Sequence, residues 1–364
     1  MSAPAHWRAN ADLAGLTTLA LPARARWLVR VEQEDELPGV LAHASRMDLP
    51  VMVLGGGSNV LFARDYPGVV IVMDLMGVQA CADGKDMLVT SAAGENWHQF
   101  VEYTLSRGWF GLENLALIPG RVGAAPVQNI GAYGVELAQR FHSLRYLDRD
   151  GGQVETLTAE QCEFAYRDSI FKNRLRDKAI ILSCTFRLSQ QFTPVLTYPA
   201  LRNALQVAGL DSDNSSIAES HEEISAQQVF DAVCAVRRSK LPDPTVLGNA
   251  GSFFRNPVVN RQHYHELSQQ WPQLPLFEIP GDPLHVKLPA AWLIEKAGWK
   301  GLRRGNIGVH DQQALVLVHD FRADAGPVQP GQALMELAAQ IAQDVWQRFA
   351  VHLEPEVQII NGIS

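Results

Sequence analysis

Two glycine-rich runs in this chain have the composition of ligand-binding loops. An apolar stretch at 51–54 leads into the first run, 55–59 (GGGSN), and the second run covers 118–134. Glycine lets the backbone approach a ligand closely and present its N–H groups to an anion. The first run is neither a dinucleotide fingerprint nor a Walker loop, because Val60 stands where the former needs glycine and no Gly-Lys-Ser/Thr follows. That run alone could be a structural turn, but the two runs together predict a large phosphorylated cofactor held mainly by backbone amides.

Three single side chains are the candidates for catalysis. Ser252 lies in 249–257 (NAGSFFRNP) without the G-x-S-x-G pattern of serine hydrolases, so we expect it to deliver a proton or merely to form a turn. Arg167 could hold a carboxylate or enolate through two parallel hydrogen bonds, or be a surface charge. Glu356 precedes a last strand and could share a proton with a reacting group if it faces a cleft.

The remaining polar residues indicate an anionic ligand and no metal. Lys240, Lys300 and Gln313 suit a phosphorylated ligand, although a single lysine is more often a solvated charge. His263 and His265 form a close pair without further ligands nearby, which favours a solvated helix or loop over a metal site. The four cysteines, Cys81, Cys162, Cys184 and Cys234, form no C-x-x-C pair and are expected to be reduced core residues of a cytosolic protein.

Length and charge exclude several classes of protein. A chain of 364 residues is expected to form two or three domains. With 31 Lys and Arg against 39 Asp and Glu, the net charge of −8 argues against binding to nucleic acid or to a membrane surface. No apolar run reaches the ~18 residues that span a bilayer, and no secretory signal is expected, so a cytoplasmic location follows.

The pattern of apolar residues predicts α+β domains rather than one doubly wound sheet, because helices and strands do not alternate steadily. A capping box at Thr158-x-x-Gln161 predicts a short helix, and another at Ser225-x-x-Gln228 predicts a second one. The polar segment 208–224 is expected to be a linker or surface excursion. Strands are expected at 51–54, 69–73, 87–91, 143–149, 153–157, 179–188 and 314–318, and helices at 95–107, 289–297 and 331–349.

Five motifs in this order resemble those of the UDP-N-acetylenolpyruvoylglucosamine reductases (MurB), the flavoenzymes of bacterial cell-wall precursor synthesis. They are 54–61 (LGGGSNVL), 118–134, 166–169 (YRDS), 248–254 (GNAGSFF) and 354–357 (EPEV), and the likeness runs from about 50 to 360. Tyr198, in Leu-Thr-Tyr, is similar to the tyrosine of the subclass that covers its substrate with a tyrosine loop.

The resemblance implies an FAD-binding domain of the vanillyl-alcohol-oxidase (PCMH) type in two subdomains, spanning about 15–190, plus a C-terminal α+β substrate-binding domain. The expected boundaries are 1–75 with 352–364 for the first FAD-binding subdomain, 76–242 for the second and 243–351 for the substrate-binding domain. The implied cofactors are FAD and NADPH, and the implied substrate is the enolpyruvyl ether of a UDP-sugar. The oligomeric state stays open, with a monomer as one option.

The resemblance also implies roles for single residues. Arg167 and Glu356 match the residues that stabilise the enolic intermediate, and Ser252 matches the proton donor. The cofactor-binding residues would be Gly55, Gly56, Gly57, Ser58, Asn59, Ile118, Pro119, Gly120, Gly123, Gln128, Asn129, Gly131, Ala132 and Tyr133. The substrate-binding residues would be Tyr166, Tyr198, Lys240, Asn256, Lys300 and Gln313.

Two other functions are compatible with part of the sequence. The glycine-rich runs alone would suit a flavin-dependent oxidase of the same fold that acts on a sugar or hydroxy acid. A UDP-sugar-binding regulator with a vestigial flavin site is the third option, against which the set of Arg167, Ser252 and Glu356 argues.

Overall fold

The computed structural model describes residues 6–207, 224–279, 281–323 and 326–361. Its chain divides into two compact units. The first contains Met1–Ala9, Trp27–Gly56 and Gly68–Ser239, and the second contains Asn10–Arg26, Gly57–Pro67 and Lys240–Ser364. Most of the predicted 208–224 linker lies outside the described residues.

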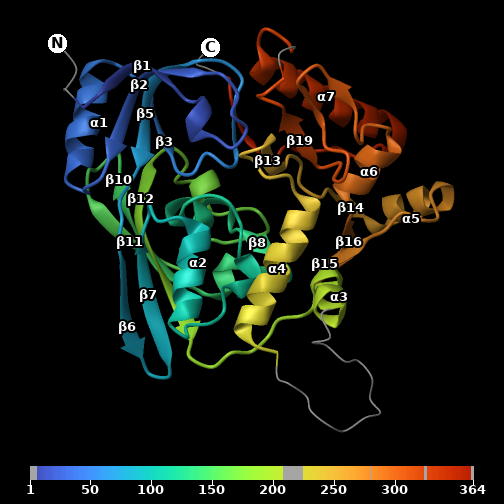
Figure 1. Cartoon of the computed structure of the whole chain (residues 1–364), viewed down its shortest axis with the longest axis horizontal. Helices are drawn as coiled ribbons and strands as arrows, with labels where there is room; N and C mark the ends of the chain where they lie inside the picture. The colour runs from blue at the N-terminus through green and yellow to red at the C-terminus, as the bar shows by residue number, and fades with distance from the viewer. Residues whose placement is uncertain (1–5, 208–223, 280, 324–325, 362–364) are drawn as a thin grey trace. The chain divides into compact units, whose positions relative to one another are not determined.

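A four-stranded sheet with the order β1-β2-β5-β3 carries the first glycine-rich run at the end of β3. Helix α1 (Glu36–Arg46) packs on this sheet, because Leu37 and Val40 share an apolar core with Val29 and Ile71 (Figure 1). The strands are β1 (Arg8–Asp12), β2 (Arg24–Val31), β3 (Val51–Leu54) and β5 (Tyr66–Met73). Strands β3 and β5 are parallel, so the chain after Leu54 leaves at a carboxyl-terminal sheet edge.

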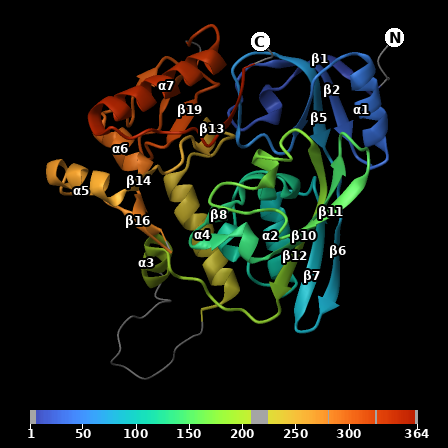
Figure 2. The ribbon, with the colours of Figure 1, turned by 180° about the vertical axis from the view of Figure 1, so that it is seen from behind.

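The larger sheet of the first unit is antiparallel, with the order β11-β10-β12-β7-β6. Two helices, α2 (Trp97–Ser106) and α4 (Ala226–Lys240), lie on the same side of this sheet (Figure 2). They bury Trp97, Phe100 and Val233 in one core with Phe186 of β12. The strands are β6 (Val78–Asp83), β7 (Asp86–Ala92), β10 (Phe141–Asp148), β11 (Val154–Thr158) and β12 (Ala179–Ser189), and helix α3 is Pro199–Val207.

The second glycine-rich run has almost no regular structure, as expected. Its elements are a seven-residue 3₁₀ segment, Val122–Gln128, and the two-residue strand β8 (Gly131–Ala132), which pairs with β9 (Val135–Glu136) just after the run. The 3₁₀ turns of this region are Glu113–Leu115, Val122–Gln128 and Leu137–Gln139, and others occur at Ala14–Leu16 and Ile170–Lys172.

Two expectations for the first unit are wrong. The Thr158 and Gln161 hydrogen bonds of a capping box form, but turns follow instead of a helix. Glu163 takes a left-handed φ of 50°, which ends any helical run after one turn. Cys81 is exposed on the edge strand β6 rather than buried. The other three cysteines are buried, and burial raises the pKa of the Cys162 thiol to about 12.

The second unit contains three small sheets and the long helix α7 (Pro330–Phe349), which contacts β18 and β19 of one sheet and β4 of another. Leu334, Leu337 and Ile341 form the predicted apolar stripe of α7 and share a core with Leu19 and Leu61 from early in the chain. The first sheet has the order β13 (Gly248–Ser252), β19 (Val316–His319), β18 (Ile307–Val309) and β17 (Arg303–Arg304). The second has the order β14 (Val258–Asn260), β16 (Asp282–Lys287) and β15 (Phe277–Ile279). The third pairs β4 (Val60–Phe62) with β20 (Gln358–Ile360). The remaining helices are α5 (Arg261–Gln270) and α6 (Ala290–Lys296).

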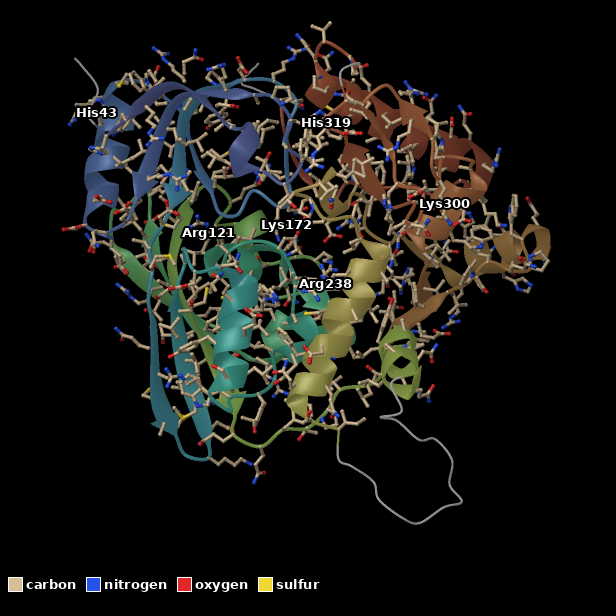
Figure 3. All side chains as sticks on the ribbon, viewed as in Figure 1. His43, Arg121, Lys172, Arg238, Lys300 and His319 are labelled. Atoms are coloured by element: carbon tan, nitrogen blue, oxygen red, sulfur yellow. The ribbon has the colours of Figure 1, made fainter. Side chains whose placement is uncertain are left out.

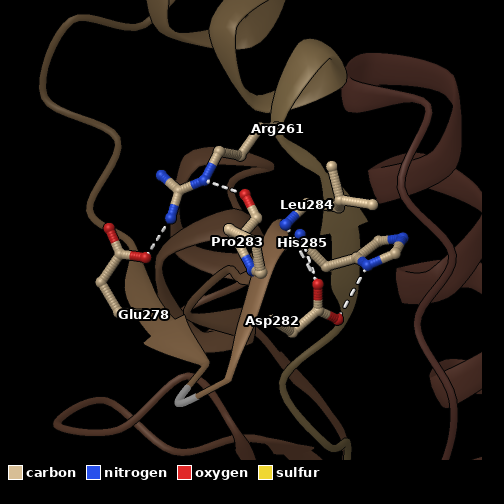
Figure 4. Close-up of polar contacts among 6 residues, drawn as sticks. All are labelled: Arg261, Glu278, Asp282, Pro283, Leu284 and His285. Atoms are coloured by element: carbon tan, nitrogen blue, oxygen red, sulfur yellow. Dashed lines mark hydrogen bonds and ion pairs between the residues drawn. The ribbon is translucent and has the colours of Figure 1, made fainter.

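The β15–β16 hairpin shows how polar side chains fix the edge of this unit (Figure 4). Arg261 donates to the Pro283 carbonyl and forms an ion pair with Glu278. His285 Nδ1 lies 2.8 Å from Asp282, and this contact lowers the pKa of the Asp282 carboxyl. His263, by contrast, contacts the Phe349 carbonyl from α5, in agreement with a structural role for that histidine.

Candidate functional site

Gly55 and Gly56, which open the first glycine-rich run, touch the second run within the first unit. A Cβ atom on Gly56 would lie 2.7 Å from the Gly120 Cα, and one on Gly55 would lie 3.2 Å from the Ala124 Cβ. Only glycine at position 56 allows this approach without movement of the loops, because such a contact is far inside van der Waals distance. The two runs therefore meet through bare backbone, and bare backbone can present N–H groups to an anionic cofactor such as FAD.

Arg121 anchors the start of the second run to the preceding sheets. Its guanidinium forms an ion pair of 2.6 Å with Asp74 and donates to the Gly94 carbonyl at 3.0 Å. Gly123 follows against β7, where a Cβ would lie 2.5 Å from the Ala93 Cβ. Figure 3 labels Arg121 in the first unit. This arginine is therefore tied to the protein itself, and its role in the run is structural.

Buried Asn129 brings the Arg167 turn to the second run. Its Nδ2 donates to the Ala165 carbonyl at 3.1 Å and to Glu136 at 2.9 Å, and its Oδ1 accepts from Ala138 N at 3.0 Å. Ala165 opens a tight turn in which Arg167 has a φ of 55°. A Cβ on Gly131 would lie 3.4 Å from Arg167 Nη1, so the guanidinium adjoins this run.

Two neighbours complete the surroundings of Arg167. Lys172, labelled in Figure 3, donates from Nζ to the Arg167 carbonyl at 2.9 Å. The ring of Tyr166 has its centroid 5.7 Å from the guanidinium carbon, a cation–π distance. Lys172 thus holds the backbone of the turn, while Tyr166 lies against the Arg167 side chain.

The segment around Tyr198 is fastened to the far end of the second run. The rings of Tyr133 and Tyr198 meet edge to face at a centroid distance of 5.1 Å. Buried Asn114 donates to the carbonyls of Tyr133 at 2.9 Å and Val195 at 2.8 Å, which fixes both segments. Tyr133 also hydrogen bonds to Arg237, and burial raises the pKa of the Tyr133 hydroxyl.

In the second unit, the chain around Glu356 runs beside the chain that follows Ser252. Glu356 N donates to the Phe253 carbonyl at 2.8 Å, and Asn59 Nδ2 donates to the Glu356 carbonyl at 3.1 Å. Ser252 pairs with Val316 in the β13–β19 register. Val316 closes the turn that contains Gln313, because Val316 N donates to the Gln313 carbonyl. Four predicted site residues, Asn59, Ser252, Gln313 and Glu356, therefore come from adjoining segments of one unit.

The backbone before Ser252 is irregular, and buried Asn249 explains why. Its Oδ1 accepts from Gly251 N at 3.1 Å, and its Nδ2 donates to the carbonyls of Pro242 at 3.0 Å and Leu247 at 2.9 Å. Gly251 has a φ of 67°, which shifts the register between Asn249 and Ser252. This bulge re-aims the serine at the end of β13.

Gly57 also has a structural requirement for glycine. It has a φ of 59°, and a Cβ there would lie 2.0 Å from the Leu16 carbonyl oxygen. Any side chain at this position would collide with the backbone of the second unit.

The other predicted substrate residues contact different parts of the second unit or are exposed. Asn256 Oδ1 accepts from Ala290 N at 3.0 Å, where α6 begins. Lys300, labelled in Figure 3, pairs with Glu295 at 3.2 Å, and Lys240 is exposed at the end of α4. Asn114 and Arg237 were not among the predicted site residues, because an amide next to Glu113 and one of two adjacent arginines near a helix end carry no pattern that marks them as anchors.

Two further properties concern the described part of the chain. Among those residues, no three His, Cys, Asp or Glu side chains are grouped as a metal site would require. None of the helices described is both long enough and apolar enough to cross a membrane.

Comparison with known proteins identifies the family. An FAD binding domain model matches residues 25–157, and a model of the UDP-N-acetylenolpyruvoylglucosamine reductase C-terminal domain matches 243–360. The reductase of Chromobacterium violaceum is 44% identical over 97% of this chain and 99% of its own length. That of Bordetella pertussis is 46% identical over 96% of this chain and 94% of its own. The chain belongs to the UDP-N-acetylenolpyruvoylglucosamine reductase (MurB) family.

A solved structure agrees with this assignment at the level of the fold. The MurB structure from Thermus caldophilus covers 96% of this chain and 97% of its own, with a TM-score of 0.61 and 21% sequence identity. The expected PCMH-type FAD-binding domain with a MurB C-terminal domain is confirmed. The chain is an FAD-dependent oxidoreductase of peptidoglycan precursor synthesis, and FAD and NADPH, the expected cofactors, are those of the MurB family.

Proposed function

We propose that this protein reduces the enolpyruvyl ether of UDP-N-acetylglucosamine to UDP-N-acetylmuramate with NADPH as the electron donor. The observation that carries the proposal is the adjacency of Ser252 and Glu356 on neighbouring segments, through the bond from Glu356 N to the Phe253 carbonyl at 2.8 Å. FAD, when bound, supplies the hydride that adds to the methylene carbon of the substrate. In a flavin-dependent oxidase, Ser252 and Glu356 would have no assigned role.

The chain's own side chains would handle the charge and the proton. Arg167 and Glu356 stabilise the negative charge that develops beside the substrate carboxylate, since donors aimed at developing charge lower the barrier. Ser252 then gives its hydroxyl proton to the neighbouring carbon. A positioned general acid contributes about 10²–10⁴-fold in rate.

The glycine-rich runs would hold FAD, with their backbone N–H groups next to its phosphates. The contact of Gly56 with Gly120 supports this assignment, because bulky side chains are excluded there. The proposed cofactor-binding residues are Gly55, Gly56, Gly57, Ser58, Asn59, Ile118, Pro119, Gly120, Gly123, Gln128, Asn129, Gly131, Ala132 and Tyr133. The proposed substrate-binding residues are Tyr166, Tyr198, Lys240, Asn256, Lys300 and Gln313, with Tyr198 and Lys240 on the diphosphate side.

We also assign the chain to the subclass with a substrate-covering tyrosine loop. Tyr198 supports this assignment, since 38% of its surface is exposed while its ring rests on Tyr133. The three-part division at 1–75 with 352–364, 76–242 and 243–351 stays a proposal, as does a cytoplasmic site of action, where NADPH and nucleotide sugars occur.

The test is a pair of half-reactions measured on Ser252→Ala. NADPH should bleach its flavin absorbance at the wild-type rate, whereas the enolpyruvyl substrate should restore the absorbance ~10²–10⁴-fold more slowly. Ser268→Ala is the matched control, because Ser268 is an exposed hydroxyl on α5 of the same unit. Reoxidation of Ser252→Ala at the wild-type rate would remove the serine from the mechanism. Rapid oxygen uptake with a sugar alcohol and no NADPH would favour an oxidase instead.

A further inference from the structure

Leu117 is an unusual residue at the entrance of the second glycine-rich run. It has a φ of 57°, although it is not a glycine, and Ile118-Pro119-Gly120 follow it directly. A residue with a Cβ rarely adopts this left-handed conformation, so surrounding contacts must hold it there. The backbone conformation of Leu117 therefore sets the direction in which the chain enters the second run.

Two ionisable side chains hold the backbone of Leu117, one at its amide N–H and the other at its carbonyl oxygen. Leu117 N donates to His98 Nδ1 at 3.1 Å, and the Leu117 carbonyl accepts from Arg237 Nε at 3.2 Å. His98 lies on α2 and Arg237 on α4, the two helices visible beside β8 in Figure 1. The helices are locked at this point, because the His98 ring stacks on Phe230 of α4 at a centroid distance of 5.4 Å and an angle of 9°.

We infer that His98 and Arg237 are positioning residues that clamp Leu117 in its left-handed conformation and thereby shape the second run for its cofactor. The inference rests on the proposed function, in which this run binds FAD. Arg237 also hydrogen bonds to Tyr133, so one guanidinium reaches both the entrance and the far end of the run. Neither residue needs to touch the cofactor for this role.

The hydrogen bond between His98 and the Leu117 amide depends on pH. Nδ1 of His98 accepts a hydrogen bond, which requires the unprotonated nitrogen. The charged groups that face His98 are Glu102 on α2, with 3.7 Å between His98 Nε2 and its carboxylate, and Arg237 and Arg238 on α4. Burial, aided by the two arginines, lowers the pKa of His98 from 6.5, while Glu102 acts against them. Acidification below about pH 6.5 should therefore weaken the hold on Leu117.

The experiment measures FAD affinity of the full-length protein between pH 5 and 8 by flavin fluorescence. His98→Leu removes the acceptor and leaves the Leu117 amide unsatisfied, so the dissociation constant should rise about tenfold at pH 7.5. His98→Asn places an oxygen near the position of Nδ1 and does not titrate. It should bind FAD within about twofold of wild type at pH 7.5 and lose the rise that wild type shows in acid. Glu102→Gln is the control, because it removes the ion pair and keeps the acceptor.

Two further measurements separate the clamp from the cofactor assignment. Leu117→Gly in the His98→Leu background should restore affinity, since glycine adopts a φ of 57° freely. Hydrogen exchange at the Leu117 amide should be slow in the wild type and fast in His98→Leu, with or without FAD. Wild-type affinity and protection in His98→Leu would overturn the inference, and so would an unchanged acid response in His98→Asn. Failure of the wild type to bind FAD, with the exchange difference intact, would overturn the proposed function alone.

Discussion

Replacement of Gly56 by alanine tests whether the two glycine-rich runs must touch. The new Cβ would lie 2.7 Å from the Gly120 Cα, whereas carbon atoms normally stay about 3.5–4.0 Å apart. The runs would have to separate by roughly 1 Å, because the colliding atom belongs to the backbone and no side chain can turn away. Overpacking of this kind costs about 1–3 kcal/mol. Since every 1.4 kcal/mol is tenfold, FAD affinity should fall by about 5- to 150-fold.

The assay is a titration of the apoprotein with FAD, followed by quenching of flavin fluorescence. Gly39→Ala is the control, because position 39 is exposed on α1 of the same unit and an added Cβ would meet nothing within 4 Å. That change should leave FAD affinity alone and stabilise the helix by up to ~1 kcal/mol. If Gly56→Ala binds FAD as tightly as the wild type, the close contact between the two glycine-rich runs has no part in binding the cofactor.

Three other changes address the anchors of the site. Asn249→Ala removes three hydrogen bonds around Gly251 and should lower the free energy of unfolding by about 2–4 kcal/mol in urea melts, with normal stability contradicting the bulge argument. Burial lowers the pKa of His319, whose Nδ1 bonds the Leu19 carbonyl at 3.0 Å. Its stabilising effect is complete above about pH 6.5 and is lost as the pH falls through the lowered pKa, so the urea midpoint should drop in acid, and less in His319→Gln. Asn114→Ala should raise KM for the UDP-sugar more than it lowers kcat, and an unchanged KM would separate Asn114 from the substrate segment.

The sequence predicted best those features that depend on neighbouring residues. Alternation and helical periodicity placed β3, β12 and α7 within a few residues of their observed bounds, because each has an uninterrupted apolar pattern. The predicted strand at 314–318 begins only at Val316, since Val316 N bonds the Gln313 carbonyl and closes a turn first. Patterns mark the interior of an element better than its ends.

Contacts between distant segments lay beyond the sequence. Asn129 joins the glycine-rich run to the Arg167 turn, and Asn114 joins Tyr133 to Val195, but an isolated amide has no periodicity to reveal such a task. The left-handed backbone conformation of Leu117 could not be predicted from the sequence either, because local preference disfavours it and only tertiary contacts impose it. The motifs located the candidate site, while its supporting side chains required the folded chain.

The parallel pair β4–β20 has a consequence for how the protein is made. Ile359 aligns with Leu61, although almost the whole chain separates them, and Leu61 is completely buried. At about 5–20 residues per second, a ribosome needs roughly 15–60 s to supply the ~300 residues in between. For that time the early apolar segment lacks its partners, and exposed apolar surface of this kind makes a nascent chain prone to aggregation. A fragment restricted to 243–360 would meet the same difficulty permanently, because Leu19 and Leu61 complete its core.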